Sequence, residues 1–316
     1  DFIECTWKED RLDAMRVAAH LNIPFKTLNL EKEYKKEVVD YMLEEYKKGN
    51  TPNPDVMCNK EVKFGAFLKY ALKEGAQYVA TGHYAQNIFN KKTGLYELHK
   101  GVDSNKDQSY FLWTLTQKEL KNIIFPVGDY KKEEVRILAK KFNLPTALKK
   151  DSQGLCFIGK VDMKDFLGHY IKEKKGNVIN ENGDVIGHHQ GVTFYTINER
   201  HGFVITKKTP NDKPYYVVGK KIKENILVVS NKNKKLNKKK EEVILENYNF
   251  ISGIPKVKES MEGRIRYRED LFTCHLISTN KNNIKIKIKN IEDNPAVGQS
   301  LVLYKGNLCV GGGVIT

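Results

Sequence analysis

The sequence predicts an α/β domain with a parallel sheet, followed by a small middle domain and a C-terminal antiparallel β-barrel. In the first half of the chain, helices with apolar stripes alternate with short apolar strands, as in a parallel sheet covered by helices. Beyond about residue 163, strand patterns separated by Asn-Gly and Gly-rich turns replace this alternation. Near the C-terminus, Ile284–Lys289 alternates isoleucine and lysine with period two, which predicts a strand with one buried face.

The elements of the first half follow from apolar periodicity and from the residues that end each segment. We expect helices over Lys8–His20, Lys32–Lys48, Glu61–Lys73, Asp107–Thr114, Thr116–Asn122, Lys131–Phe142 (capped by Asp129) and Asp162–Ile171. Strands are expected over Phe25–Leu30 and Gln77–Thr81, and a β-hairpin over Tyr84–Phe89 and Leu95–Lys100. Ligands of such a sheet are expected at the carboxyl ends of its strands.

These patterns divide the chain into an α/β domain (residues 1–163), a middle domain (164–235) and a barrel domain (236–316). The run of Lys and Asn near residues 231–240 is the expected linker between the last two domains. The chain begins with Asp1 rather than Met, and in the middle of an α/β pattern. We therefore expect the native N-terminus to precede it.

The charge of the chain predicts a polyanionic partner. Its 316 residues include 54 Lys and Arg against 39 Asp and Glu, a net charge of +15. A balance this basic favours nucleic acid over a membrane, and the sequence shows no signal peptide and no apolar run of membrane-spanning length. Genome composition or a solvated linker is the alternative source of part of this charge, because Lys and Asn are abundant throughout.

The cysteines argue against a disulfide-stapled secreted domain and against a structural zinc site, since there is no CxxC pair and no dense framework. They are Cys5, Cys58, Cys156, Cys274 and Cys309. No metal site is predicted, and the compartment is expected to be reducing.

Two of the cysteines lie in loops that can support chemistry. Cys58 follows a Pro-rich loop and precedes a predicted helix, where the helix dipole and Lys60 and Lys63 favour the thiolate. Cys156 lies in the polar segment Asp151–Ile158, with lysines on both sides. A buried hydrophobic role is the alternative for each, and it is the role we assign to the other three.

Two polar segments follow predicted strands. In Thr81–Ala85, Gly82 lets a flat or phosphorylated ligand approach the backbone, although a plain tight turn has the same pattern. His83 is compatible with a general base, an RNA contact or a turn residue, and we favour the contact. Lys106–Ser109 combines a cation with amide and carboxylate groups suited to phosphate and base-edge contacts, with a helix cap as the alternative.

Three arginines near the C-terminus are a further candidate site. Arg264, Arg266 and Arg268 alternate along one predicted strand, so their side chains share a face while Tyr267 lies on the other. Three guanidinium groups on one face favour an anionic ligand. Surface salt bridges to neighbouring carboxylates are the alternative.

In chain order, these segments resemble the motifs of the bacterial and organellar tRNA-specific 2-thiouridylases. The segments are Asn53–Lys60, Thr81–Ala85, Gly101–Leu112, Asp151–Ile158, Arg266–Arg268 and the ending from Gly298-Gln299 to Gly311–Gly313. The resemblance implies an adenine nucleotide α-hydrolase-like (PP-loop) first domain. It also implies an enzyme that uses ATP, with Mg²⁺, and a persulfide to replace the C2 oxygen of the wobble uridine of tRNA by sulfur. The implied partners are tRNA and a persulfide sulfur donor protein, in the cytoplasm or an organellar matrix.

The resemblance also implies a role for each motif residue. Cys156 would carry the persulfide and Cys58 would act as the nucleophile, leaving a transient disulfide between the two. Asn53, Pro54 and Asp55 would face the target base, and Gly82 would contact ATP. The implied tRNA contacts are His83, Lys106, Asp107, Gln108, Arg266, Tyr267 and Gln299.

Two departures from the family pattern keep other functions open. The family's N-terminal phosphate loop, Ser-Gly-Gly-x-Asp-Ser, is absent from this sequence, and Thr196–Arg200 replaces a more usual Thr-Ile-Gly-Gln-Arg. Three hypotheses follow: a thiolating enzyme, a tRNA-binding module without thiolation activity, and a dithiol redox protein unrelated to RNA. The net charge and the arginines count against the third.

Overall fold

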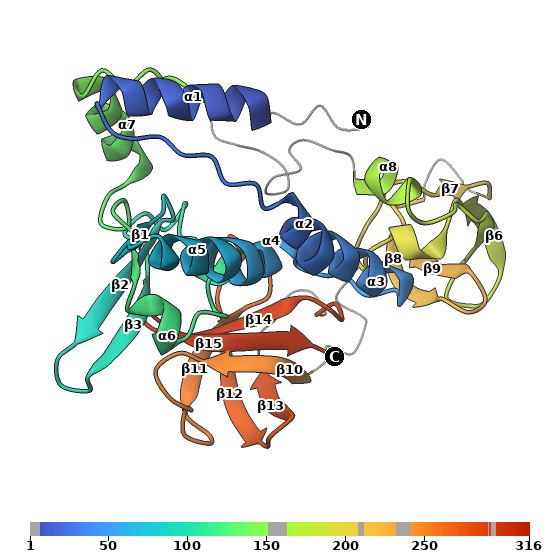
Figure 1. The fold of residues 1–316 in the computed structure, drawn as a ribbon. Helices are drawn as coiled ribbons and strands as arrows, with labels where there is room; N and C mark the ends of the chain where they lie inside the picture. The colour runs from blue at the N-terminus through green and yellow to red at the C-terminus, as the bar shows by residue number, and fades with distance from the viewer. Residues whose placement is uncertain (1–6, 151–162, 208–211, 232–240, 290, 292–294) are drawn as a thin grey trace.

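The computed structural model describes residues 7–150, 163–207, 212–231, 241–289, 291 and 295–316. Its elements form a helical part with a small parallel sheet, a five-stranded sheet and a large antiparallel sheet (Figure 1). Within the described residues, no helix combines the length and apolar character needed to cross a bilayer.

Among its described residues, the α/β part contains the predicted parallel pairing as a single pair of strands. Strand β1 (Val79–Ala80) pairs in parallel with β4 (Ile123–Ile124). Two long helical stretches cover this part, Glu31–Lys47 and Pro54–Lys73, and each contains a π-helical segment. The helices are α1 (Trp7–His20), α2 (Glu31–Tyr34), η1 (Lys35–Asp40), α3 (Tyr41–Lys47), α4 (Pro54–Met57), η2 (Cys58–Phe67), α5 (Leu68–Lys73), η3 (Ser109–Phe111), α6 (Gln117–Leu120) and α7 (Lys132–Lys141).

Three local predictions for this part are wrong. Phe25–Leu30 forms no strand, because this mostly exposed segment has no strand pairing among the described residues. Asp107–Thr114 is helical only in the single 3-10 turn Ser109–Phe111. Asp129 does not cap α7: Lys131 is the N-cap residue, and its backbone N–H donates to Glu134, while Asp129 accepts a hydrogen bond from the Gln86 side chain.

The middle part is a five-stranded sheet next to the helical part. After helix α8 (Met163–Gly168), the strands lie in the order β7-β6-β5-β9-β8. Met42 of α3 is buried in the same core as Val178, Val217 and Leu227 of this sheet, so α3 joins the two parts (Figure 1). The strands are β5 (Gly176–Ile179), β6 (Val185–His189), β7 (Val204–Ile205), β8 (Tyr216–Lys221) and β9 (Ile226–Ser230).

The C-terminal part is the predicted antiparallel barrel. Strand β10 pairs with both β13 and β15, which closes the sheet. Along β13, Ile284, Ile286 and Ile288 are buried, which confirms the period-two prediction. The strands are β10 (Glu242–Phe250), β11 (Ser260–Arg264), β12 (Phe272–Thr279), β13 (Asn283–Ile288), β14 (Ser300–Lys305) and β15 (Leu308–Ile315).

The predicted hairpin of the first domain extends the barrel sheet. It consists of β2 (Ala85–Asn90) and β3 (Leu95–Lys100), and β3 pairs with β15 through His99 and Leu308. The helix Pro54–Lys73 also packs against the barrel, since Phe64 shares a core with Val302 of β14. The first domain and the barrel are thus joined by both backbone pairing and apolar burial, which positions their loops against each other.

Candidate functional site

Asn53 caps the helix that carries Cys58. Its side-chain oxygen accepts a hydrogen bond from the backbone N–H of Val56 at 3.3 Å, and Pro54 occupies the first helical position. Asp55 lies in the first turn, where the helix dipole favours a carboxylate. The helix therefore begins at Pro54 and not near Glu61 as predicted. An N-cap asparagine followed by proline is a helix-start signal that our interpretation of this segment as a loop missed.

Cys58 lies inside this helix and is buried. Only 1 % of its surface is exposed, and it packs with Val38 and Val62 from two helical stretches. A sulfur donor can therefore reach this thiol only if the surrounding side chains move. The other cysteine predicted to act, Cys156, lies outside the described residues with the rest of 151–158, and so does Cys5.

The two barrel cysteines have the properties of structural residues. Cys274 and Cys309 are free thiols with no exposed surface. Burial raises the pKa of Cys274 to about 12 and also raises the pKa of Cys309 well above its ordinary value. Both stay protonated at neutral pH and are poor nucleophiles.

Gly82 and His83 follow strand β1 but differ in exposure. Gly82 is exposed, and a Cβ atom there would meet no heavy atom within 4 Å, so a flat ligand has room to approach the backbone. His83 is 7 % exposed, its Nδ1 atom lies 2.7 Å from the Thr81 hydroxyl, and its ring contacts Phe64. Burial, with a smaller contribution from Lys63, lowers the pKa of His83 to about 3. The imidazole is therefore neutral at physiological pH.

Asp107 is buried, and its carboxylate interacts with other groups of the protein. Its carboxylate accepts backbone hydrogen bonds from Gly101 at 3.2 Å and Ser109 at 3.1 Å, and it lies 3.5 Å from the Arg264 guanidinium. Only 3 % of the residue is exposed. Its side chain thus shapes the turn around Gln108, whose side-chain oxygen accepts from the backbone N–H of Tyr84, next to His83.

The prediction that three arginines alternate along one strand is wrong. Strand β11 ends at Arg264, and Arg268 has a φ of 63°, so the chain turns where the strand was expected to continue. This turn lies against the segment that follows β3. The Arg268 side chain donates to the carbonyl oxygen of Asn105 at 2.9 Å, and the Tyr267 hydroxyl donates to that of Lys106 at 3.5 Å.

The loop before Asn53 lies on the barrel. The backbone N–H of Thr51 donates to the Val297 carbonyl at 2.8 Å. Gly298 has a φ of 91°, and a Cβ atom there would lie 3.0 Å from the Thr51 carbonyl oxygen. This close approach places Gln299, which is half-buried, beside the segment that leads to Asn53.

The predicted contact segments therefore form one connected cluster. Contacts link the Asn53 loop to residues 297–299, residues 105–106 to 267–268, and Gln108 to the segment that carries His83. The Tyr110 hydroxyl joins these groups, because it lies 3.5 Å from the Asn53 amide nitrogen and donates to the carbonyl oxygen next to Arg266. Two of its basic side chains, Lys106 and Arg266, are half-buried. A cluster with cations, amides and a helix start suits phosphate and base contacts.

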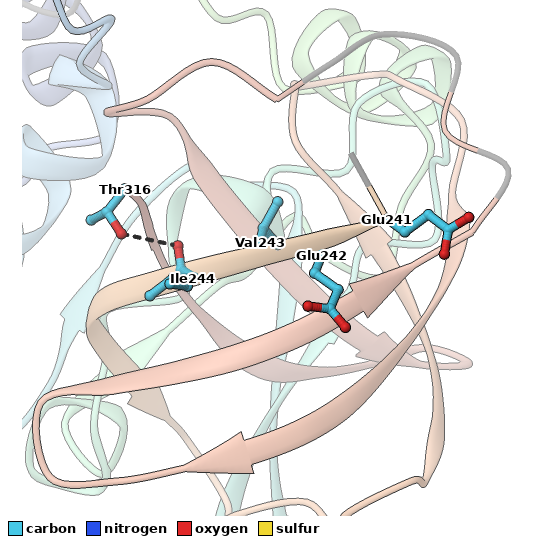
Figure 2. A pocket seen from close by; sticks show the side chains of 5 residues that line it. All are labelled: Glu241, Glu242, Val243, Ile244 and Thr316. Carbon is cyan, nitrogen blue, oxygen red and sulfur yellow. Dashed lines mark hydrogen bonds between the residues drawn. The ribbon is translucent and has the colours of Figure 1, made fainter. Parts of the chain in front are cut away.

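A pocket elsewhere in the molecule has different chemistry. Figure 2 shows it between β10 and the C-terminus, where the hydroxyl of Thr316 donates to the carbonyl of Ile244. Its lining residues are Glu241, Glu242, Val243, Ile244 and Thr316. The two glutamates disfavour a phosphate ligand, and none of the predicted site residues lines it. Among the residues with described positions, no group of three or more His, Cys, Asp or Glu side chains could hold a metal ion.

Three family models match consecutive parts of the chain. They are described as "tRNA methyl transferase HUP domain" (residues 1–160), "tRNA methyl transferase PRC-barrel domain" (164–231) and "Aminomethyltransferase beta-barrel domain" (240–315). Curated proteins with the name "tRNA-specific 2-thiouridylase MnmA" are similar over nearly the whole chain. The one from Buchnera aphidicola is 44 % identical over 98 % of this chain and 85 % of its own length. Those from Staphylococcus epidermidis (42 %, 98 % and 83 %) and Listeria monocytogenes serotype 4b (44 %, 100 % and 84 %) are similar to the same degree.

Proposed function

Because the chain belongs to the family of tRNA-specific 2-thiouridylases, we propose that it replaces the C2 oxygen of the wobble uridine (position 34) of tRNA by sulfur, using ATP and a cysteine persulfide. The observation that carries this proposal is the connected cluster around Asn53, Lys106–Gln108, Arg266–Tyr267 and Gln299. The net charge of +15 supports an RNA substrate.

The sulfur chemistry is assigned to Cys156 and Cys58. Cys156 receives a sulfur atom from a donor protein and becomes a persulfide. The Cys58 thiolate attacks the Sγ atom of Cys156, the sulfur–sulfur bond of the persulfide breaks, and the outer sulfur leaves as hydrosulfide. That sulfur replaces the oxygen at C2 of the uridine. A Cys58–Cys156 disulfide remains, and two electrons from an external thiol reductant restore both cysteines.

The C2 oxygen of uridine is a poor leaving group, and ATP is needed to activate it. Bound ATP would supply an adenylyl group to the C2 oxygen, with release of pyrophosphate, and the activated oxygen would leave as AMP when sulfur attacks C2. At the carboxyl end of β1, the exposed backbone of Gly82 has no heavy atom within 4 Å of where a Cβ atom would lie, which would let a nucleotide approach it. Mg²⁺ would arrive with the ATP phosphates.

The RNA contacts divide by position in the cluster. We assign Asn53, Pro54 and Asp55 to the target base, which is already single-stranded in an anticodon loop and costs little to unstack. Lys106, Gln108, Arg266, Tyr267 and Gln299 are assigned to the surrounding RNA, and neutral His83 to a contact rather than to proton transfer. Asp107 acts through Arg264 and the turn that it holds. We place the reaction in the cytoplasm or an organellar matrix, with the three domains at 1–163, 164–235 and 236–316.

The direct test is 2-thiouridine formation. The protein is incubated with unmodified tRNA, ATP, Mg²⁺ and a persulfide donor, and the nucleosides of the digested tRNA are identified by mass spectrometry. We expect 2-thiouridine at position 34, and none when ATP is omitted or when Cys58→Ser is used. Cys274→Ser is the matched control and retains activity. Tight tRNA binding without any 2-thiouridine would instead assign the chain as an RNA-binding module.

A further inference from the structure

Tyr110 lies where the predicted contact segments meet. Its side chain is 1 % exposed, and it belongs to the single helical turn Ser109–Phe111 of the first domain. The hydroxyl lies 2.8 Å from the carbonyl oxygen of Ile265 and 3.2 Å from that of Ser300, and it is 3.5 Å from the Asn53 amide nitrogen. Each of these three partners is in, or next to, a different predicted contact segment.

The hydrogen-bonding capacity of a tyrosine matches this arrangement. A phenol has one proton to donate and oxygen lone pairs to accept with. The proton is shared between the Ile265 and Ser300 carbonyls, with Ile265 closer, and the oxygen accepts from Asn53. Burial raises the pKa of Tyr110 well above its ordinary value, so the hydroxyl keeps its proton at every working pH.

The next residue of the turn extends this arrangement. The Phe111 ring contacts the Tyr267 ring with centroids 4.8 Å apart, and the Phe111 carbonyl accepts from the Asn59 side chain at 3.4 Å. Asn59 directly follows Cys58 in the helix. The turn Ser109–Phe111 therefore contacts the loop at Asn53, the helix of Cys58, the turn at 265–267 and the start of β14.

We infer that Tyr110 is a positioning residue whose hydroxyl fixes the base-facing loop at Asn53 against the RNA-contacting segments at 266–267 and 299. The inference rests on the proposed function for its catalytic consequence. A bound uridine reacts only when its C2 atom is held at the correct distance from the attacking sulfur, and small misplacements of bound groups cost large factors in rate. The loop and these segments lie in different domains, and the Tyr110 hydroxyl adds a direct side-chain contact between them to the pairing and burial that join the domains.

The test compares Tyr110→Phe with Tyr304→Phe. Both variants keep the ring and delete one buried hydroxyl at the same domain boundary, but the Tyr304 hydroxyl lies 3.2 Å from the Ser109 hydroxyl and makes no described contact with the base-facing loop. Turnover is measured at saturating tRNA. For Tyr110→Phe we expect kcat to fall about tenfold, with KM for tRNA changing less than about twofold. Tyr304→Phe stays within about twofold of the wild type in both.

Amide hydrogen exchange of the same variants supplies a readout that does not depend on activity. Tyr110→Phe should exchange faster than Tyr304→Phe in residues 53–57 and 265–268. Equal exchange in those segments, or equal kcat for the two variants, would overturn the inference. A wild-type protein that makes no 2-thiouridine would instead contradict the proposed function, and the exchange comparison would still decide the positioning role.

Should Tyr110→Phe fold poorly, a second measurement replaces it. Asn53→Ala removes the amide donor from the other side of the contact, and exchange in residues 265–268 is followed. Faster exchange there, transmitted through the Tyr110 hydroxyl, supports the inference. Unchanged exchange at 265–268 contradicts it.

Discussion

His83 shows how burial decides the chemistry of a single residue. Next to a strand end, a histidine is a candidate general base, but the folded chain keeps this imidazole neutral, with its pKa lowered to about 3. The unfolded chain has the ordinary pKa of 6.5. Between these values the unfolded state binds one more proton than the folded state, so the free energy of unfolding falls as the pH drops below about 6.5.

This difference predicts a measurable pH dependence. At pH 5.5 the residue should lower the free energy of unfolding by about 1.4 kcal/mol relative to pH 7.5. Denaturant unfolding of the wild type and of His83→Gln at both pH values gives the comparison, since all other titrating groups are shared. The wild type should lose about 1.4 kcal/mol more than the variant. An equal loss in both proteins would show that His83 is not held neutral.

At the scale of single residues, the sequence indicates which residues belong to the site better than it indicates what each of them contacts. The family resemblance implies an RNA contact for Asp107, but Arg264, 157 residues away, lies beside its carboxylate. Tyr110 lay inside a recognised motif with no role assigned, because its hydroxyl partners are 155 and 190 residues distant. Long-range pairing of this kind leaves no local pattern.

At the scale of elements, the helix Pro54–Lys73 combines a structural and a recognition role in one residue. Asn53 caps the helix through its side-chain oxygen, and its side-chain nitrogen lies near Tyr110. Asn53→Ala should therefore lower the free energy of unfolding by about 1 kcal/mol. Asn53→Asp keeps the capping oxygen and should leave stability within about 0.5 kcal/mol of the wild type.

Activity separates the two roles of Asn53. Both variants lose the amide donor, so both should form 2-thiouridine at least about tenfold more slowly at saturating tRNA. Chemical denaturation and the nucleoside assay measure the two quantities. Full activity in Asn53→Asp would restrict this residue to the helix cap.

Elements with strong periodicity were predictable, and elements that depend on a partner were not. The hairpin β2–β3 and the alternating strand β13 formed as expected. Phe25–Leu30 has the composition of a strand but no described strand beside it, and the arginine alternation was interrupted by the turn at Arg268. That the hairpin would join the barrel through His99 and Leu308 could not be seen in either segment alone.

At the scale of the whole molecule, the net charge of +15 predicts the response to salt. Lysines and arginines that neutralise RNA phosphates release counterions, so tRNA affinity should fall linearly on a log–log plot against salt. Six phosphate contacts would lower affinity roughly a thousandfold between 50 and 200 mM salt. Filter binding or fluorescence anisotropy over that range measures the slope. A flat plot would remove the RNA assignment.

The proposed reaction requires different roles for Cys58 and Cys156, the attacking thiolate and the persulfide carrier. The deciding measurement is the intact mass of the wild type, Cys58→Ser and Cys156→Ser after incubation with a persulfide donor, with peptide mapping of the added sulfur. We predict one added sulfur on Cys156 in the wild type and in Cys58→Ser, and none in Cys156→Ser. Sulfur accumulating on Cys58 instead would contradict these roles.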